Sequence, residues 1–358
     1  MKFIHCADLH LDSKMDKLSS DKAKIRREEI VHTFERLCKY ALDNGVRAVI
    51  ISGDMFDTAK VTIKTRERVL HAISSTPSVD FLYLSGNHDE VNFIDSLDNK
   101  PENLKIFNDE WSSFRYENAV ISGVVFTPFN TNTIYDNLTL NENDFNIVVL
   151  HGQIVGYKSQ DKAETISLPR LKDKNIDYLA LGHIHEHVID KLDLRGVYAY
   201  SGCLEGRGFD ETGDKGFIEI EVDDNNSTYN FVPFANRTLY TYEYIVDNKP
   251  DFFVCKNEII SYLTKNIPDS SLIKVVLKGK RKTDFIIDEL SLLNELNEKF
   301  FFVKVYDKTE VLVNESDYEL DKTVRGEFVR AVWESQLSSD LKSKILTCGL
   351  NALKGEDL

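Results

Sequence analysis

Residues 48–57 read AVIISGDMFD, and this stretch decides the fold. Its four apolar residues, 48–51, predict a buried strand that ends at once in the polar group Ser52-Gly53-Asp54. The same arrangement, an apolar run followed directly by a polar cluster, occurs after residues 2–6 and after residues 81–84. The chain therefore repeats a unit in which a short strand delivers polar side chains at its carboxyl end.

Helices are predicted between these strands. Apolar residues recur at helical spacing over 22–44, where Asn44-Gly45 supplies a stop signal, and a second helix is predicted over 64–74. Four further strands are predicted at 119–125, 147–150, 178–181 and 196–200. Strands that alternate with helices favour an α/β fold with a parallel or mixed sheet, and the carboxyl ends of such strands share one edge.

Five short polar clusters follow the predicted strands. They are Asp8-x-His10, Gly53-Asp54, Gly86-Asn87-His88, His151 and Gly182-His183-x-His185. Carboxylate, amide and imidazole groups are the ligands that hard and borderline divalent metals prefer. A shared sheet edge would bring the clusters together although they are far apart in the sequence. The sequence therefore predicts a metal site.

Two divalent cations about 3.5 to 4 Å apart need one shared anionic ligand and several neutral donors. Asp54 is the candidate for the shared ligand, because Gly53 and a following helix would present its two oxygens rigidly. The remaining ligands divide into Asp8, His10 and His185 for one cation, and Asn87, His151 and His183 for the other. His183 and His185 are two residues apart on an extended segment, so their imidazoles can reach neighbouring cations.

The composition is that of an ordinary globular protein. The chain has 358 residues, 42% hydrophobic and 29% charged, enough for two domains or one large one. We expect no signal peptide, no membrane span and a cytoplasmic location. The five cysteines are an odd number without a CxxC pair, which favours reduced thiols. The formal net charge of -15 opposes unaided tight binding to a polyanion such as DNA.

A change in residue usage predicts a domain boundary near Ala235-Asn236. All nine histidines precede Val188, and the rest of the chain alternates shorter strands and helices. We expect three parts: a domain over 1–235 that carries the site, a smaller α+β domain over 236–322, and a helical segment over 323–358.

The motifs DLH, GDMFD, GNHDE, LHG and LALGHIH resemble the five phosphoesterase motifs of the calcineurin-like metallophosphoesterase superfamily. Within it, GDMFD, YLALGHIH and YSGCLEGRGFDETGDKGF are similar to the SbcD-type nucleases, the catalytic subunits of DNA double-strand-break repair complexes. The resemblance is strong over the first two thirds of the chain and weak in the tail. It implies a four-layer αββα core, a smaller α+β capping domain and C-terminal helices.

The resemblance also implies the chemistry. Two divalent ions, Mn²⁺ in this group, would hold the ligands assigned above and activate a hydroxide that attacks a DNA phosphodiester in line. His88 would protonate the leaving oxygen or stabilise charge on the phosphate, and Asp57 would orient His88. The expected activities are 3′-to-5′ exonuclease and single-strand endonuclease action in DNA end processing.

Basic residues follow the first two metal motifs. Lys14 and Lys60 belong to these runs, which are either solvated surface or contacts to the DNA backbone. The resemblance places Arg207, in the GRGF loop, near the substrate as well. Four other histidines are expected to be structural or solvated: His5, His32, His71 and His187.

Partners are implied by the tail. Two helices are predicted over 324–353, and in the SbcD-type group such a pair binds the coiled-coil root of an SMC-like ATPase of SbcC type, with the nuclease as a homodimer. Phe328 and Trp333 would be the anchors, although apolar stripes of this kind also simply cap a core.

Two alternative functions remain open. A phosphomonoesterase or cyclic-nucleotide phosphodiesterase would use the same metals and fits the acidic charge. A non-catalytic DNA-end-binding subunit is disfavoured by the intact motifs.

Overall fold

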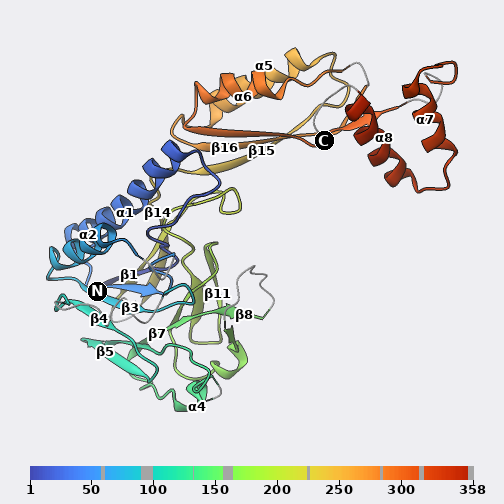
Figure 1. Ribbon diagram of the computed structural model, residues 1–358. Helices are drawn as coiled ribbons and strands as arrows, with labels where there is room; N and C mark the ends of the chain where they lie inside the picture. The colour runs from blue at the N-terminus through green and yellow to red at the C-terminus, as the bar shows by residue number, and fades with distance from the viewer. Residues whose placement is uncertain are drawn as a thin grey trace. The chain divides into compact units, whose positions relative to one another are not determined.

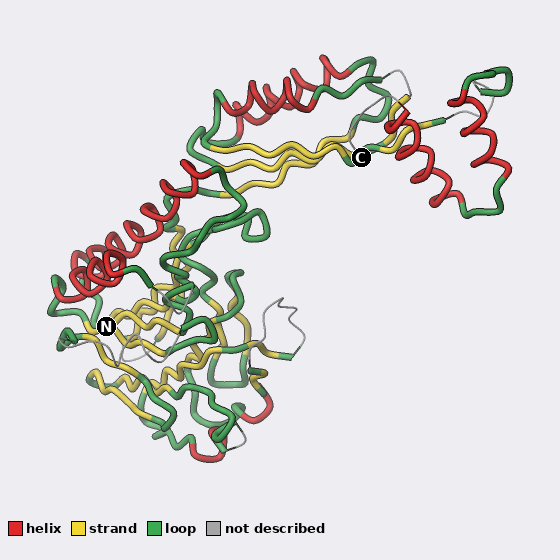
Figure 2. The backbone as a smooth tube through the Cα atoms, viewed as in Figure 1, coloured by secondary structure: helices red, strands yellow, loops and turns green. Residues whose placement is uncertain are grey.

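The computed structural model describes residues 1–57, 61–89, 100–131, 133–155, 164–223, 226–282, 285–313 and 318–353. The chain divides into two compact units, Met1–Thr238 and Leu239–Leu358. Figure 1 follows the chain from its blue N-terminus through green and yellow to the red C-terminal helices, and Figure 2 distinguishes helices from strands. Among the described helices, none combines the length and apolar character that crossing a membrane requires.

Two six-stranded mixed sheets form the first unit. The first has the order β14-β13-β1-β2-β3-β4, and the second has the order β11-β12-β10-β7-β6-β5. Strands β1 to β4 are parallel in the first sheet, as are β12, β10, β7 and β6 in the second, and antiparallel strands complete the edges.

The bounds of the first sheet are Ser227–Pro233 (β14), Gly216–Val222 (β13), Lys2–Cys6 (β1), Ala48–Ser52 (β2), Asp80–Leu84 (β3) and Leu104–Ile106 (β4). Those of the second are Val188–Lys191 (β11), Val197–Tyr200 (β12), Tyr178–Gly182 (β10), Phe145–His151 (β7), Ala119–Gly123 (β6) and Ser112–Tyr116 (β5). A two-stranded pair, Gln153–Ile154 (β8) and Thr165–Ile166 (β9), lies outside them.

The central strands are buried on both faces because helices cover one side of the first sheet and the second sheet covers the other. Side chains of a strand alternate between its faces. In β2, Val49 and Ile51 pack with helices α1 (Ser20–Asp43) and α2 (Ile63–Ser74), whereas Ala48 and Ile50 pack against the second sheet. Each fully buried Val or Ile side chain contributes about 1.5 to 3 kcal/mol to folding.

The outer face of the second sheet has its own core. Leu179 and Leu181 of β10 pack there with α4 (Ile134–Asn137), with the loop around the short 3-10 helix Leu168–Arg170, and with β8 and β9. The predicted four-layer αββα architecture is therefore confirmed. Within the described residues, the fourth layer consists of short helices and loops.

The second unit contains a three-stranded parallel sheet, with the order β15-β16-β18. Its strands are Leu239–Ile245, Leu272–Lys278 and Phe302–Asp307. Helices α5 (Phe252–Asn266) and α6 (Glu289–Asn297) cover one face, where they bury Ile273, Val275 and Leu277 of β16 (Figure 1).

The end of the second unit forms a separate small core. Strands β17 (Lys280–Lys282) and β19 (Glu310–Leu312) pair, and α8 (Ser339–Leu353) packs with β19 and α7 (Val324–Glu334). Val311, Val329 and Leu350 are buried in this core. Two helices thus occupy the stretch where the apolar spacing predicted them.

Candidate metal centre

The loops after five parallel strands converge at one edge of the two sheets. Asp8 and His10 follow β1, Asp54 follows β2, Asn87 and His88 follow β3, His151 ends β7, and His183 follows β10. The loops are joined through their backbones, since Asp8 N donates to Gly53 O at 3.1 Å and His10 N donates to Asp54 O at 3.0 Å. The structure therefore brings together clusters that are up to 175 residues apart.

The backbone at this edge is strained. Asp8, His10, Asp54 and His183 have positive φ angles of 52°, 44°, 53° and 100°, although none of them is a glycine. Such conformations cost about 1 to 3 kcal/mol each and persist only where the surrounding structure imposes them. Here they turn the side chains away from the strand direction and toward a common point.

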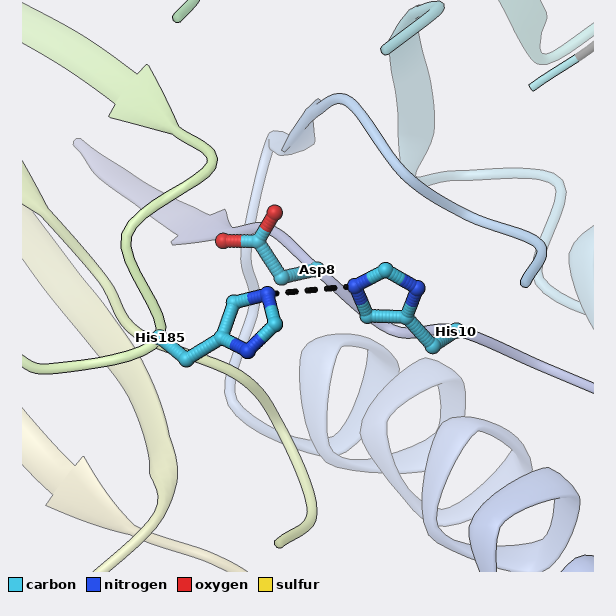
Figure 3. Close-up of side chains that lie close together, drawn as sticks. All are labelled: Asp8, His10 and His185. Atoms are coloured by element: carbon cyan, nitrogen blue, oxygen red, sulfur yellow. Dashed lines mark hydrogen bonds between the residues drawn. The ribbon is translucent and has the colours of Figure 1, made fainter. Parts of the chain in front are cut away.

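The first group of possible ligands comprises Asp8, His10 and His185 (Figure 3). Their ligand atoms all lie within 4.8 Å of one another. The Nε2 atoms of His10 and His185 are 3.2 Å apart, and the two rings meet nearly edge to face. The Asp8 carboxylate is held beside them by the backbone N–H of His183, at 2.9 and 3.1 Å from its two oxygens.

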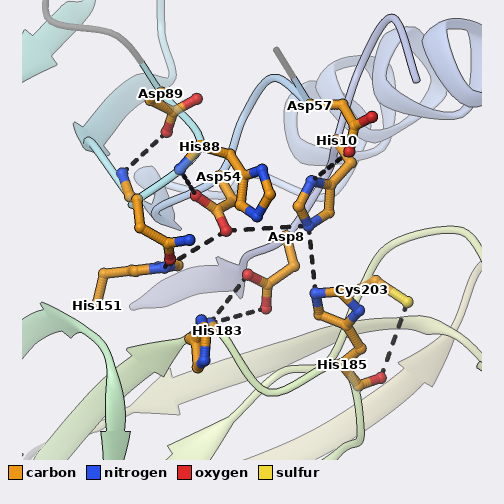
Figure 4. Close-up of polar contacts among 12 residues, drawn as sticks. Asp8, His10, Asp54, Asp57, His88, Asp89, His151, His183, His185 and Cys203 are labelled. Carbon is orange, nitrogen blue, oxygen red and sulfur yellow. Dashed lines mark hydrogen bonds and ion pairs between the residues drawn. The ribbon is translucent and has the colours of Figure 1, made fainter. Parts of the chain in front are cut away.

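The second group comprises Asp54, His151 and His183, whose ligand atoms also lie within 4.8 Å of one another. His151 is fixed by a contact of 2.8 Å between Nδ1 and Ser52 O, so its Nε2 faces the site. Asn87 Oδ1 lies 2.9 Å from that Nε2, so Asn87 is close enough to complete the group. Figure 4 shows both groups together.

Asp54 lies between the two groups. Its Oδ2 is 3.9 Å from Nε2 of His10 and 3.5 Å from Nε2 of His151. Its Oδ1 accepts a hydrogen bond of 2.9 Å from the backbone N–H of His88, which fixes the carboxylate. One oxygen of Asp54 is therefore near both ligand groups, as a bridging ligand must be.

The electrostatics of the site favour positive charge. Burial disfavours a charged His151, but the Asp54 carboxylate outweighs burial and raises the pKa of His151 to about 9. Burial likewise opposes ionisation of Asp54, but His151 and His10 hold the pKa of Asp54 below its usual range. Among the described residues, nothing accepts from or donates to the buried Nε2 of His183. A buried carboxylate between histidines with a free ring nitrogen is the donor set of a divalent-cation site, so the residues fit the metals that the sequence predicts.

His88 and Asp57 lie beside the first group. The His88 ring is half-buried, 5.2 Å from the His10 ring and nearly perpendicular to it. Asp57 Oδ1 is 3.1 Å from His10 Nδ1 and accepts from Arg207 Nη1 at 2.6 Å. Burial acts to raise the pKa of Asp57, but His10 and Arg207 outweigh it and lower this pKa. The orientation of His88 by Asp57 stays a prediction.

The other predicted residues lie elsewhere. Lys14 is exposed, and Lys60 lies outside the described residues. Arg207 is only 19% exposed and points into the site's charged groups. His5 is buried between the sheets with Nδ1 2.8 Å from the Tyr178 hydroxyl. Three further histidines are exposed: His32 and His71 on the helices, and His187, whose ring stacks on Phe231.

The sequence reasoning passed over two acidic residues. Asp89, from the GNHDE motif, accepts from the backbone N–H groups of Met55, Phe56 and Gly86, and so joins the loops after β2 and β3. Burial and the nearby Asp54 raise the pKa of Asp89. Glu211 is 5% exposed and its Oε1 is 2.8 Å from His185 Nδ1. A chain with 59 acidic residues gives no local signal for this Glu.

Known proteins resemble this chain. A family model described as calcineurin-like phosphoesterase matches residues 1–187. A Bacillus subtilis protein named uncharacterized metallophosphoesterase YhaO is 28% identical over 250 residues, which cover 64% of this chain and 60% of that protein. This chain thus matches less than two thirds of that relative's length.

Archaeal relatives match over more of the chain. The DNA double-strand break repair protein Mre11 of Sulfolobus acidocaldarius is 22% identical over 339 residues, covering 88% of this chain and 85% of that protein. The protein of the same name from Saccharolobus solfataricus is 23% identical over 348 residues, covering 90% and 86%. These matches extend past the residues of the first unit.

Proposed function

Because the chain belongs to the calcineurin-like phosphoesterase family, we propose that it is a two-metal DNA nuclease that hydrolyses phosphodiesters. The observation that carries this proposal is the position of Asp54. Its Oδ2 lies within 4 Å of a histidine from each ligand group, at 3.9 and 3.5 Å. The shared carboxylate supports a pair of cations about 3.5 to 4 Å apart, the spacing used for in-line displacement at phosphorus.

The assignment of ligands follows the two groups. Asp8, His10 and His185 would hold one cation, Asn87, His151 and His183 would hold the other, and Asp54 would be the shared ligand. Divalent cations bound there would act as Lewis acids on the phosphodiester and activate the attacking water. We propose Mn²⁺, the ion that the resemblance to the SbcD-type nucleases implies, and the carboxylate and amide oxygens of the site suit it.

His88 is proposed as the general acid. The Asp54 carboxylate accepts from the backbone N–H of His88, and the His88 ring lies 5.2 Å from the His10 ring, beside the proposed ligands. From this position it can donate a proton to the leaving oxygen. General acids of this kind contribute about 10²- to 10⁴-fold to the rate.

DNA is proposed as the substrate because of the extent of the relatives. The matches to the Mre11 proteins cover 88% and 90% of this chain, more than the 238 residues of the first unit contain. A small phosphomonoester would not need the second unit for its binding, whereas DNA is large enough to contact it. In keeping with the acidic chain, we propose that a partner helps to bind DNA, namely an SbcC-like ATPase, with the nuclease as a cytoplasmic homodimer.

The helices α7 and α8 are the proposed docking site for that partner. Val324 of α7 and Leu341 of α8 are 72% and 44% exposed, and Leu337 in the loop between the two helices is 41% exposed. Exposed apolar side chains that gather on one helical pair mark interaction surfaces. A pull-down with the cognate ATPase should be lost when the chain is truncated before Val324, and unchanged binding would contradict the docking proposal.

The nuclease proposal is tested with the purified Mn²⁺ form. We expect cleavage of end-labelled single-stranded and duplex DNA, with and without the candidate ATPase, and little turnover of a chromogenic phosphomonoester. Asp54→Ala and His88→Ala should lose hydrolysis, the latter by about 10²- to 10⁴-fold. The exposed His71 on α2 offers a matched control, since His71→Ala should keep full activity.

Two outcomes favour other functions. The net charge of -15 favours a small-substrate phosphatase, and faster turnover of the phosphomonoester than of DNA would select it. An empty or one-metal site by elemental analysis would favour a non-catalytic DNA-end-binding subunit. Full Mn²⁺-dependent turnover by Asp54→Ala would falsify the assignment of the site itself.

A further inference from the structure

Each of the two histidines of the first ligand group has a carboxylate beside its Nδ1 atom, His185 in a hydrogen bond and His10 at ion-pair distance. His185 Nδ1 lies 2.8 Å from Glu211 Oε1, and His10 Nδ1 lies 3.1 Å from Asp57 Oδ1. Their other ring nitrogens converge, with 3.2 Å between the Nε2 atoms beside Asp8. Each ring therefore has a carboxylate at Nδ1 and an open position at Nε2.

Arg207 joins the two carboxylates. Its Nη1 donates to Asp57 Oδ1 at 2.6 Å, and its Nη2 and Nε donate to Glu211 Oε1 at 2.9 and 3.3 Å. Its backbone N–H donates to the second oxygen of Glu211 at 2.6 Å. The planar guanidinium presents its donors in a fixed fork, so one arginine can set the spacing of both acids.

These contacts leave Arg207 poorly placed to bind substrate. All three nitrogens of the guanidinium donate to Asp57 or Glu211, and the side chain is 19% exposed. Glu211 is 6% exposed in its side chain, and Lys215 donates to the carbonyl of His185 at 2.9 Å from the same loop. The expected contact of Arg207 with substrate has no support in this geometry.

We propose that Arg207 and Glu211 are positioning residues for the cation that Asp8, His10 and His185 hold, a role that rests on the two-metal function proposed above. Glu211 accepts the Nδ1–H of His185, and Asp57 places its carboxylate 3.1 Å from Nδ1 of His10, so both Nε2 atoms are left to face the cation. A carboxylate behind a metal-binding histidine fixes its tautomer and ring orientation. Arg207 keeps the two carboxylates, and therefore the two rings, at one separation.

The arrangement is confined to one ligand group. In the second group, His151 is held by the backbone carbonyl of Ser52 and not by an acid. Loss of Arg207 or Glu211 should therefore weaken the binding of one cation and leave the binding of the other unchanged. Substitution of such supporting residues costs about 10- to 100-fold in metal affinity.

The experiment measures Mn²⁺ binding to the full chain by titration calorimetry, independently of activity. Wild type should bind two ions. Arg207→Met and Glu211→Gln should each lower the affinity for one ion by about 10- to 100-fold. The affinity for the other ion should stay within about twofold of the wild-type value. Arg207→Lys keeps the charge but loses the planar set of guanidinium donors. Its affinity for the ion of the first ligand group should lie between those of wild type and Arg207→Met.

A matched control separates positioning from general damage. Arg195 pairs with Asp177 through Nε and Nη2, as Arg207 pairs with Glu211, but outside the site. Arg195→Met should bind both ions as wild type does. If Arg207→Met binds both ions with the affinities of the wild type, the inference is overturned. Equal weakening of the binding of both ions, together with a lower unfolding temperature of the metal-free chain, would also overturn it. A wild-type chain that binds no ions contradicts the proposed function and overturns the inference with it.

Discussion

Gly182, the last residue of β10 in the second sheet, lies close to Ser52 of β2 in the first sheet. A Cβ atom at this residue would be 1.9 Å from Ser52 O and 2.8 Å from His151 Nδ1. Gly182→Ala should therefore push β10 away from β2 and displace a proposed ligand. We expect a loss of about 1 to 3 kcal/mol in the free energy of unfolding, measured by urea denaturation, and a weaker affinity for Mn²⁺.

The control for this substitution is Gly45→Ala. Gly45 also has a positive φ, 65°, but a Cβ there would meet no atom within 4 Å. This variant should lose stability through backbone strain and keep its metal affinity. Equal metal affinity in both alanine variants would contradict the close approach at Gly182.

At the residue scale, the sequence predicted what is local. Asp8, His10 and Asp54 were found because each follows a strand within a few residues. Glu211 was not found, because its role depends on an approach to His185 across 26 residues of chain. The role given to Arg207 was a substrate contact, whereas its structural neighbours are acids of the site.

Helix α1 is tied to the site by a buried ion pair. Arg26 is fully buried, and its Nη2 donates to Glu205 Oε2 and to Gly206 O, both at 2.8 Å. This places the first helix against the loop that carries Arg207. Arg26→Met leaves the buried Glu205 without its charged partner, so we expect a loss of about 3 to 5 kcal/mol in the free energy of unfolding, measured by chemical denaturation.

The exposed Lys24 on the same helix provides the comparison. Lys24→Met should change the free energy of unfolding by less than about 0.5 kcal/mol. A similar small effect of Arg26→Met would mean that the ion pair does not anchor α1.

The pH dependence of stability should reflect Glu29 on α1. Burial acts to raise the pKa of Glu29, but Arg237 and Arg26 outweigh it and lower the pKa below the ordinary value of 4.5. A carboxyl with a lowered pKa stabilises the fold above its unfolded-state pKa and loses this contribution as the pH falls through the folded-state value. The unfolding temperature should therefore fall more steeply below about pH 4.5 in wild type than in Glu29→Gln. Parallel curves would contradict this origin.

At the element scale, central strands were predictable and edge strands were not. Strand β2 is a continuous apolar run because helices and the second sheet bury both of its faces. Strand β14 alternates between half-buried and exposed residues and lies at the edge of its sheet, so its sequence carries little apolar signal. Strand β5 alternates in a similar way, whereas β11 has two half-buried residues followed by two exposed ones, and both strands lie at an edge of the second sheet.

At the scale of the whole molecule, the first unit holds its own cores and the whole candidate site. The three large apolar clusters of the two-sheet unit contain only residues up to Phe234, and the remaining two contain only residues after Leu239. A fragment of residues 1–238 should therefore fold cooperatively and bind two Mn²⁺ ions by calorimetry. A fragment that is unfolded by circular dichroism would show that the first unit needs the second.

The two sheets contribute different parts of the candidate centre: the first supplies Asp8, His10 and Asp54, and the second supplies His151, His183 and His185. An ion held by both would act as a staple across the sandwich. By thermodynamic linkage, each site filled at 100 times its dissociation constant adds about 2.7 kcal/mol to the folded state. Chelation should thus lower the unfolding temperature and expose the inter-sheet edge to proteolysis, whereas an unchanged temperature would exclude the staple. Under this linkage, the supply of divalent ions governs how long the chain stays folded as well as how fast it hydrolyses its substrate.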